Sequence, residues 1–256
     1  MIAMALFAPW LAPYHPIDDA DLLYSEEPPG IQFWFGTDTQ GRDILSRVIY
    51  GARISLSVGL VSQLMNSVIG IILGLTAGYF GKWWDDLVMG MTNIMLSIPG
   101  VIFALAIMAV LGPGLMNVFI ALGLTNWSYS CRITRSQVLS TRDLSYVKAA
   151  EAIGYGRIRI MFTQILPNII GPILVIGTLG IAGAILMEAA LSFLGLGMPV
   201  TMPSLGSLIR SGQEYIFSGS WWITVFPGIW LVIFVLVINL LGDWLRDVFN
   251  PKLYKG

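Results

Sequence analysis

Long stretches without a charged side chain constrain this chain more than any other feature of its sequence. Asp, Glu, Lys and Arg are absent from residues 54–81, 87–131, 160–187, 189–209 and 215–242. A helix needs about 20 mainly apolar residues to cross the hydrocarbon layer of a membrane, and inside that layer it satisfies its own backbone hydrogen bonds. The sequence therefore predicts an all-α protein that spans a membrane several times.

The overall composition agrees with a membrane protein. Hydrophobic residues make up 56% of the chain and charged residues only 11%, whereas a soluble domain carries about 25% charged residues. The net charge of −1 gives no reason to expect a nucleic acid as a partner. Cys131 and His15 are the only residues of their kinds, which excludes an internal disulfide and a His/Cys metal cage. We therefore expect no metal site in this chain.

The charge-free stretches predict where the helices cross the membrane. The stretch 87–131 is too long for one span, and Gly112-Pro113-Gly114 indicates a turn inside it. We expect spans near residues 55–78, 87–111, 115–136, 169–194 and 223–245. The apolar segment 1–14 is short and interrupted by prolines, and it lacks the basic start of a signal peptide. We expect a partial first span there, which gives about six transmembrane helices.

The basic residues predict the orientation of these spans. Of 14 Lys and Arg residues, only Arg42, Arg47, Arg53 and Arg210 lie on the outer side if both termini are cytoplasmic. Because Lys and Arg favour cytoplasmic loops, we expect this topology rather than its reverse. The chain then divides into an extracytoplasmic loop at 15–52, a transmembrane domain at 53–249 and a cytoplasmic tail at 250–256.

The largest expected cytoplasmic feature is the loop 137–168. Apolar side chains recur there at helical spacing, at Tyr146, Ala149, Ala150 and Ile153. Asp143 or Ser145 can cap this helix and Gly154 can end it. A second apolar stripe follows at Ile158, Met161, Phe162 and Ile165, before Pro167 breaks the chain. Such a bent pair of helices enters a groove in a partner protein or lies in the membrane interface, and the pattern alone leaves both interpretations open.

At this loop the sequence resembles the permease subunits of binding-protein-dependent ABC importers. Their signature is Glu-Ala-Ala, three residues, Gly, nine residues and then Ile-x-Leu-Pro. Here Ala149-Ala150, Gly154 and Leu166-Pro167 stand at that spacing. Lys148 replaces the acidic residue and Gln164 replaces the isoleucine.

Further segments are similar to one branch of these permeases, the C-type subunits of dipeptide, oligopeptide and nickel importers. These segments extend over nearly the whole chain: Gly36–Asp38, Gly41–Asp43, Ser46-Arg47, Gly51–Leu56, Ala190–Gly197, Asn239–Asp243 and Arg246-Asp247. The resemblance implies the fold of a type I ABC importer permease with a cytoplasmic coupling helix, located in the cytoplasmic (inner) membrane.

The resemblance also implies partners for the chain. Relatives work with a homologous second permease subunit, two cytoplasmic ABC ATPase subunits and an extracytoplasmic solute-binding protein. This chain has no G-x-x-x-x-G-K-[ST] loop to cradle phosphates, so we expect ATP and Mg²⁺ to bind the ATPase subunits. We expect no catalytic residue and no cofactor in the chain itself. Its expected functional site is the ATPase-coupling loop, with Tyr146, Ala149, Ala150, Gly154, Leu166 and Pro167.

Two polar residues inside the expected spans are candidates for lining the translocation path or for packing. An acidic residue within a span is a functional hypothesis by default, and Glu188 could attract the ammonium group of a peptide. The resembling permeases often carry an acid here whatever their substrate, so we favour a packing role for Glu188. Asn239, near the end of the last span, is expected to tie helices together.

Two other classes of function compete with this interpretation. A secondary carrier would use Glu188 for ion coupling, but it leaves the 137–168 pattern unexplained. An intramembrane serine hydrolase needs a base beside its nucleophile, and His15, the single histidine, lies at or in the outer loop. We expect an importer of dipeptides or oligopeptides, or of nickel complexes, and the sequence leaves that choice of solute open.

Overall fold

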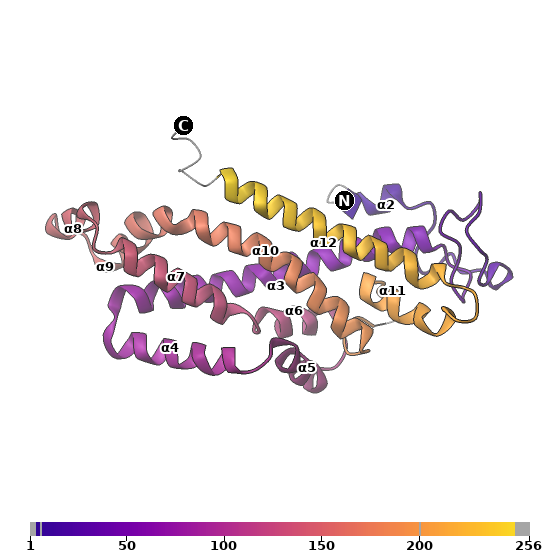
Figure 1. The fold of residues 1–256 in the computed structure, drawn as a ribbon, viewed down its shortest axis with the longest axis horizontal. Helices are drawn as coiled ribbons and strands as arrows, with labels where there is room; N and C mark the ends of the chain where they lie inside the picture. Colours follow the sequence, from indigo (N-terminus) through magenta and orange to yellow (C-terminus); the bar gives the residue numbers. More distant parts are fainter. Residues whose placement is uncertain (1–3, 6, 200, 249–256) are drawn as a thin grey trace. The chain divides into compact units, whose positions relative to one another are not determined.

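The computed structural model describes residues 4–5, 7–199 and 201–248, and this part of the chain is mainly helical, as expected. Within this described part, one isolated β-bridge joins Thr37 and Asp43. Figure 1 shows the helices, which are α2 (Ala8–Leu11), α3 (Ile44–Phe80), α4 (Lys82–Ser97), α5 (Gly100–Leu111), α6 (Leu115–Gly123), α7 (Trp127–Thr141), α8 (Ser145–Ala152), α9 (Arg157–Ile160), α10 (Leu166–Phe193), α11 (Leu205–Gly212) and α12 (Trp222–Val248).

Among the described residues, three helices are long and apolar enough to cross a membrane. They are α3, the continuous helix Arg157–Phe193 that contains α9 and α10, and α12. The pair α4 and α5 makes a fourth span if the two helices are counted together. The sequence predicted about six spans, and the difference comes from breaks inside two of the expected spans and from the short N-terminal helix.

The expected single span at 87–111 is wrong in detail, because the chain bends by 88° between α4 and α5. Pro99 lies at the break, and Ile98 before it is extended, with φ −93° and ψ 124°. A residue that precedes proline is driven out of the α-helical region by a clash with the proline ring. The expected span at 115–136 is likewise divided, into α6 and α7.

Helix α3 begins at Ile44, well before the start expected near residue 55. Asp43 precedes its first residue, and one carboxylate oxygen accepts hydrogen bonds from the backbone N–H of Ser46 (2.7 Å) and from its hydroxyl (2.6 Å). This contact satisfies a backbone donor that the first helical turn leaves free. The predicted segment 1–14 includes residues outside the described part; among the described ones, Met4 and Ala5 are helical and α2 follows. The predicted tail 250–256 also lies outside the described residues.

The chain forms two compact units. The first unit contains Met1–Val61, Ala104–Leu122 and Ile181–Ile238. Its larger apolar cluster uses Ile44, Val48, Ala52 and Leu56, which lie four residues apart on one face of α3. These side chains pack with residues of α10, α11 and α12, such as Ile185, Leu205 and Phe234.

The second unit contains Ser62–Phe103, Gly123–Gly180 and Asn239–Gly256. Here α3 and α7 approach closely through Gly70, Gly74 and Gly78, whose spacing of four residues is typical of a packing seam between helices. A Cβ atom added at Gly74 would lie 2.4 Å from the backbone oxygen of Cys131, and one at Gly78 would lie 2.8 Å from the Cβ of Val138. Both distances are too short for real atoms, so this seam requires glycine at both positions.

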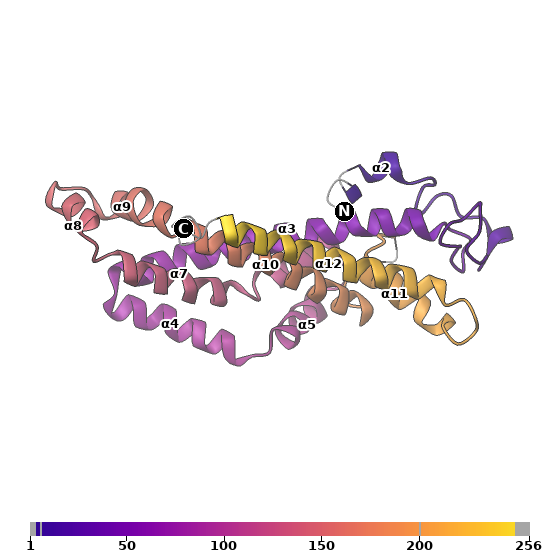
Figure 2. The same cartoon turned by 45° about the horizontal axis from the view of Figure 1, so that its top comes forward.

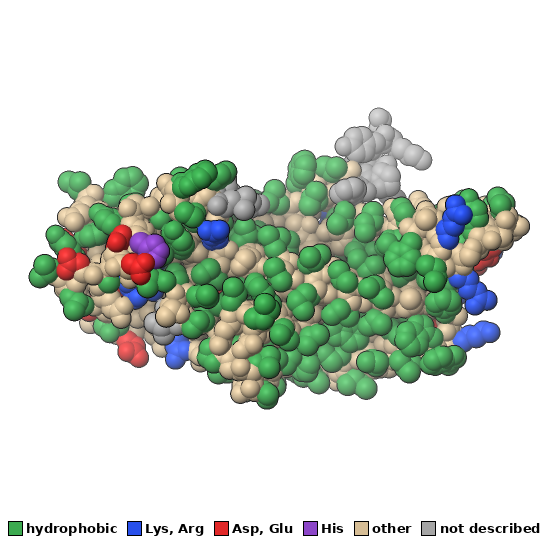
Figure 3. Space-filling view, turned by 180° about the vertical axis from the view of Figure 1, so that it is seen from behind, with side chains coloured by type: hydrophobic (Ala, Val, Ile, Leu, Met, Phe, Trp, Pro, Cys, Tyr) green, Lys and Arg blue, Asp and Glu red, His purple; other side chains and the backbone are tan. Residues whose placement is uncertain are grey.

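The outer surfaces of the helices are apolar. Figure 3 shows hydrophobic side chains over most of the helical surface in that view. Large exposed examples include Leu64 on α3, Ile102 on α5 and Leu240 on α12. A soluble monomer rarely exposes an extended apolar surface, whereas lipid or a partner subunit covers such a surface without cost.

We predict that Gly74→Ala destabilises the protein by about 1–3 kcal/mol, because the added methyl group overpacks the seam between α3 and α7. The measurement is the thermal unfolding midpoint of the detergent-solubilised protein. Gly90→Ala on α4 is the matched control, since no described atom lies within 4 Å of the position of its Cβ. Equal unfolding midpoints for the two variants would contradict the close contact at Gly74.

Candidate functional site

The site is built around α8, which follows a turn at the end of α7. Neither Asp143 nor Ser145 caps α8 within the described structure, contrary to the prediction. Leu144 occupies the N-cap position with an extended backbone, and Asp143 instead lies 3.5 Å from the Lys148 ammonium. The start of α8 is therefore set by the turn itself rather than by a side-chain cap.

The predicted end of α8 at Gly154 is confirmed. Gly154 has φ +92°, a conformation that glycine adopts without a steric penalty. Its N–H donates to the carbonyl of Glu151 (2.9 Å), and the N–H of Tyr155 donates to the carbonyl of Ala150 (3.1 Å). This pair of hydrogen bonds is a Schellman motif, which satisfies the last helical carbonyls and turns the chain sharply.

One face of α8 is anchored in the second unit. Val147 is fully buried and Ala150 is nearly so. They pack in one cluster with Leu75 of α3, Val138 of α7 and Ile160 of α9. The sequence pattern missed Val147, although its spacing of three residues from Ala150 places both on one helical face.

The predicted apolar stripe on α8 divides into an inner and an outer part. Ala150 belongs to the buried face, whereas Ala149 is exposed. Tyr146 is 39% exposed and Ile153 is 76% exposed. The two adjacent alanines therefore lie on different faces of the helix, and the sequence pattern did not distinguish these faces.

The helix after Gly154 does not break at Pro167, contrary to the prediction. Arg157–Phe193 is one continuous helix, with a π-helical turn at Met161–Ile165 directly before Leu166 and Pro167. In a regular α-helix the proline ring would clash with the carbonyl four residues earlier. The wider π turn places that carbonyl differently, so the helix continues through the proline.

The second predicted stripe is also shared between two faces. Met161 and Ile165 are buried in the same cluster as Val147, while Ile158 is 69% and Phe162 49% exposed. Leu166 packs against the edge of this cluster. Helices α8 and α9 lie side by side in both views (Figure 1 and Figure 2) and contact each other. The segment thus presents a group of exposed apolar side chains, which we call the outer face: Tyr146, Ala149, Ile153, Ile158 and Phe162.

Polar contacts hold the elements beneath this segment. The Arg135 guanidinium on α7 makes a two-point ion pair with Asp85 on α4, with N···O distances of 2.5 and 2.6 Å. Arg142 donates to the backbone carbonyl of Gly78 at 2.7 Å. The hydroxyl of Tyr79 donates to the Glu151 carboxylate of α8 at 3.2 Å. Charged hydrogen bonds of this kind are the stronger ones, and here they join α3, α4, α7 and α8.

Glu188 lies in the first unit and is fully buried. The Ser55 hydroxyl of α3 donates to one carboxylate oxygen at 3.0 Å, and the Ser192 hydroxyl donates to the other at 2.6 Å. Ser192 in turn accepts a hydrogen bond from the backbone N–H of Met198. The carboxylate therefore joins α3 to α10 and, through Ser192, to the following loop. Asn239 is half-buried on α12 in the second unit.

The outer loop is ordered around a second buried carboxylate. Asp38 accepts a hydrogen bond from the Arg42 guanidinium at 2.8 Å and pairs with Arg47 of α3. Arg42, Arg47 and the exposed Arg210 line a cavity of about 440 Å³ that also includes Ser192. Ser192, whose hydroxyl donates to Glu188, thus also lines this cavity in the first unit.

Comparisons with known proteins agree on one family. Residues 70–255 match the family described as binding-protein-dependent transport system inner membrane component. The di/tripeptide transport system permease protein DppC of Pseudomonas aeruginosa (strain UCBPP-PA14) is 42% identical over 99% of this chain and 85% of its own length. A relative named as the probable D,D-dipeptide transport system permease protein DdpC of Escherichia coli (strain K12) is 37% identical over 98% of this chain and 84% of its own length.

Solved structures show the same fold at low sequence identity. An inward-facing structure of the MetNI methionine ABC transporter has a TM-score of 0.65 and 19% identity, covering 81% of this chain and 98% of that one. An amino acid ABC transporter has a TM-score of 0.60 and 15% identity, covering 79% and 94%. These likenesses confirm the predicted type I importer permease fold.

We predict that Glu188→Leu lowers the stability of the protein by about 1–3 kcal/mol per buried hydroxyl left without its partner. Glu188→Gln retains an oxygen that can accept a hydrogen bond from one of the two serines, so it should preserve assembly and solute uptake. The measurements are the unfolding midpoint in detergent and uptake by the reconstituted transporter. Normal assembly of the Glu188→Gln variant with loss of uptake would assign Glu188 to the translocation path instead.

Proposed function

The chain belongs to the family of binding-protein-dependent transport system inner membrane components, and from this premise we propose that it forms half of the path of an ATP-driven dipeptide importer. It is a multi-pass permease subunit of the inner membrane. Relatives named as dipeptide or di/tripeptide permeases match 98–99% of the chain. Their names favour a short peptide over a nickel complex as the solute, and nothing in the comparisons supports a secondary carrier.

We place the contact with the ATPase subunits at the outer face of α8 and α9. Exposed apolar side chains on a charged segment mark a protein interface, and Lys148, Glu151 and Arg157 belong to the same segment. A helix lying in the membrane interface would turn its apolar face to lipid, but the most deeply buried residues of α8, Val147 and Ala150, already pack inside the protein. The small side chain of Ala149 lets a partner approach the backbone closely.

Force applied to this outer face has a direct route into the membrane helices. Val147 and Ala150 on the opposite side of α8 contact the cluster that contains Leu75 of α3 and Val138 of α7. Packed elements of this kind move as rigid bodies between discrete arrangements. ATP-driven closure of the partners would then shift α3 and α7 together and switch access to the path.

This proposal implies which partner proteins the chain works with. A homologous permease supplies the other half of the path, and an extracytoplasmic solute-binding protein delivers the peptide. Two ABC ATPase subunits bind ATP and Mg²⁺, because this chain has no phosphate-binding loop. Both termini lie in the cytoplasm, which places α8 on the ATPase side of the membrane.

Two adjacent alanines give a matched pair of variants for the coupling function. Ala149→Phe should leave the fold intact but abolish binding of the ATPase subunits and dipeptide uptake, because the ring fills the space that the partner needs. Ala150→Phe should instead lower the unfolding midpoint, because overpacking a buried site costs about 1–3 kcal/mol. The measurements are co-purification of the ATPases, the unfolding midpoint and uptake of a labelled dipeptide.

The unmodified transporter, reconstituted with its cognate binding protein, provides the control. It should take up the dipeptide in an ATP-dependent manner. Uptake of a nickel complex but not of dipeptides would contradict the proposed solute and leave the coupling proposal standing. Full ATPase binding and uptake in Ala149→Phe would contradict the coupling site.

A further inference from the structure

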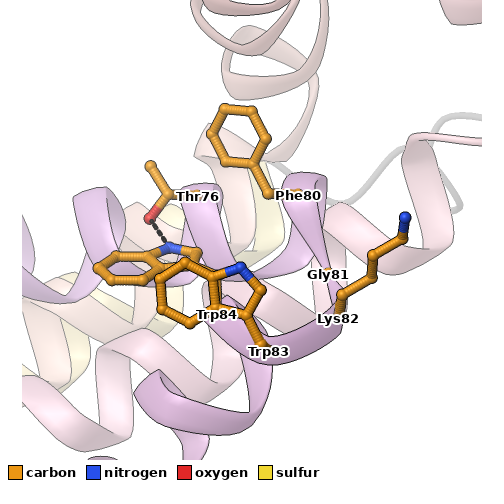
Figure 4. Close-up of a pocket in the computed structure, with 6 residues that line it drawn as sticks. All are labelled: Thr76, Phe80, Gly81, Lys82, Trp83 and Trp84. Atoms are coloured by element: carbon orange, nitrogen blue, oxygen red, sulfur yellow. Dashed lines mark hydrogen bonds between the residues drawn. The ribbon is translucent and has the colours of Figure 1, made fainter.

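Two cavities at the end of α3 in the second unit share Phe80 and Lys82 as lining residues. The first has a volume of about 400 Å³ and is lined by Thr76, Phe80, Gly81, Lys82, Trp83 and Trp84 (Figure 4). Trp84 donates its indole N–H to the Thr76 hydroxyl at 3.2 Å, so the polar edge of this ring is satisfied within the protein. Trp83 is 70% exposed. The wall of this cavity is therefore aromatic and largely apolar.

The second cavity is basic. It has a volume of about 450 Å³ and is lined by Tyr79, Phe80, Lys82, Arg142, Asp143, Lys148, Glu151 and Arg157. Asp143 lies within 3.6 Å of both Arg142 and Lys148. Lys82 and Arg157 have no ion pair with any side chain in the part of the chain that the structure describes. The cavity thus carries four basic groups against two acidic groups and has an excess of positive charge.

Lys82 joins the two cavities and has an unusual backbone. Its φ is +54°, directly after Gly81 with φ +63°. A side chain other than that of glycine is strained in this region, and such strain gathers at functional positions. Figure 4 shows the Lys82 ammonium pointing away from the indole rings of Trp83 and Trp84. The strained residue therefore places a cation beside an aromatic cavity without filling it.

We propose that the two cavities together bind one anionic phospholipid. Lys82 and Arg157 hold the phosphate of the headgroup, and Phe80 and Trp83 contact the adjoining acyl chain. The site lies at the end of α3, an apolar helix of 37 residues that is long enough to cross the membrane. Tryptophan and basic side chains are favoured where such a helix meets the membrane surface, and basic pockets at this depth attract anionic headgroups.

The apolar cavity distinguishes a lipid from the other anions that the basic cavity could hold. A free phosphate would use Lys82 and Arg157 but would leave the surface of Phe80 and Trp83 uncovered. An acidic segment of an ATPase subunit would also use only the basic side. The lipid satisfies both cavities at once, and its headgroup would lie next to Glu151 and Lys148 of α8, beside the outer face.

The test uses the complete purified transporter, delipidated in detergent and titrated with phosphatidylglycerol or phosphatidylcholine of the same acyl chains. Native mass spectrometry counts the lipids that this subunit retains after it is released from the complex. The unmodified chain should retain one phosphatidylglycerol in preference to phosphatidylcholine. Lys82→Gly removes the ammonium and relieves the strained φ, so it should weaken phosphatidylglycerol binding about fivefold without unfolding the chain. Adding Arg157→Gln should weaken it by about thirtyfold in total.

Further variants separate the possible occupants. Arg53→Gln removes an equal charge from α3 at a residue that lines neither cavity, and it should leave lipid retention unchanged. Trp83→Ala should lower retention of both lipids, because it removes acyl contact rather than charge. Competition by inorganic phosphate equal to that by phosphatidylglycerol would overturn the lipid assignment. Unchanged lipid retention in the double variant, with weakened ATPase binding, would also overturn it and assign the basic cavity to the partner protein.

Discussion

The packing of Val147 and Ala150 against Leu75 and Val138 is the contact on which the rest of the structure depends. It fixes the short helix α8 to α3 and α7 through buried apolar surface, and the hydrogen bond from Tyr79 to Glu151 adds a polar contact. An eight-residue helix is too short to be stable by itself in water, so α8 keeps its shape because its inner face is covered. Its outer face is then free to bind another molecule without loss of the fold.

Contacts around α8 connect it to several helices of the second unit. The glycine seam brings the backbones of α3 and α7 into contact, and the Arg135–Asp85 pair ties α7 to α4. The Schellman motif at Gly154 returns the chain into the continuous helix Arg157–Phe193. Contacts therefore connect α8 to α3, α4, α7 and the helix Arg157–Phe193. The lipid site that we propose adds a contact between these connected helices and the surrounding membrane.

Much of this architecture could be predicted from local rules. Stretches without charge marked the apolar helices, the small-residue spacing marked the α3–α7 seam, and Gly154 marked the end of α8. The bend before Pro99 also follows a local rule, but the uniform hydrophobicity of 87–111 concealed it. The two sides of α8 could not be separated by sequence, because Val147, Ala149 and Ala150 are all apolar. Which of them is buried depends on the positions of Val138 and of Leu75, and Leu75 lies about 70 residues earlier in the chain. The helix continues through Pro167 because a π turn precedes it, and no residue in the sequence indicates that turn.

The central claim is that the outer face of α8 receives the ATPase subunits, and thiol labelling at Ala149→Cys tests it most directly. The natural chain has a single cysteine, Cys131, which is buried, so the new thiol is the accessible one. The labelling rate would be compared between the permease subunits alone and the complete transporter. The account predicts rapid labelling in the first sample and strong protection in the second. Equal labelling rates in both samples would contradict it.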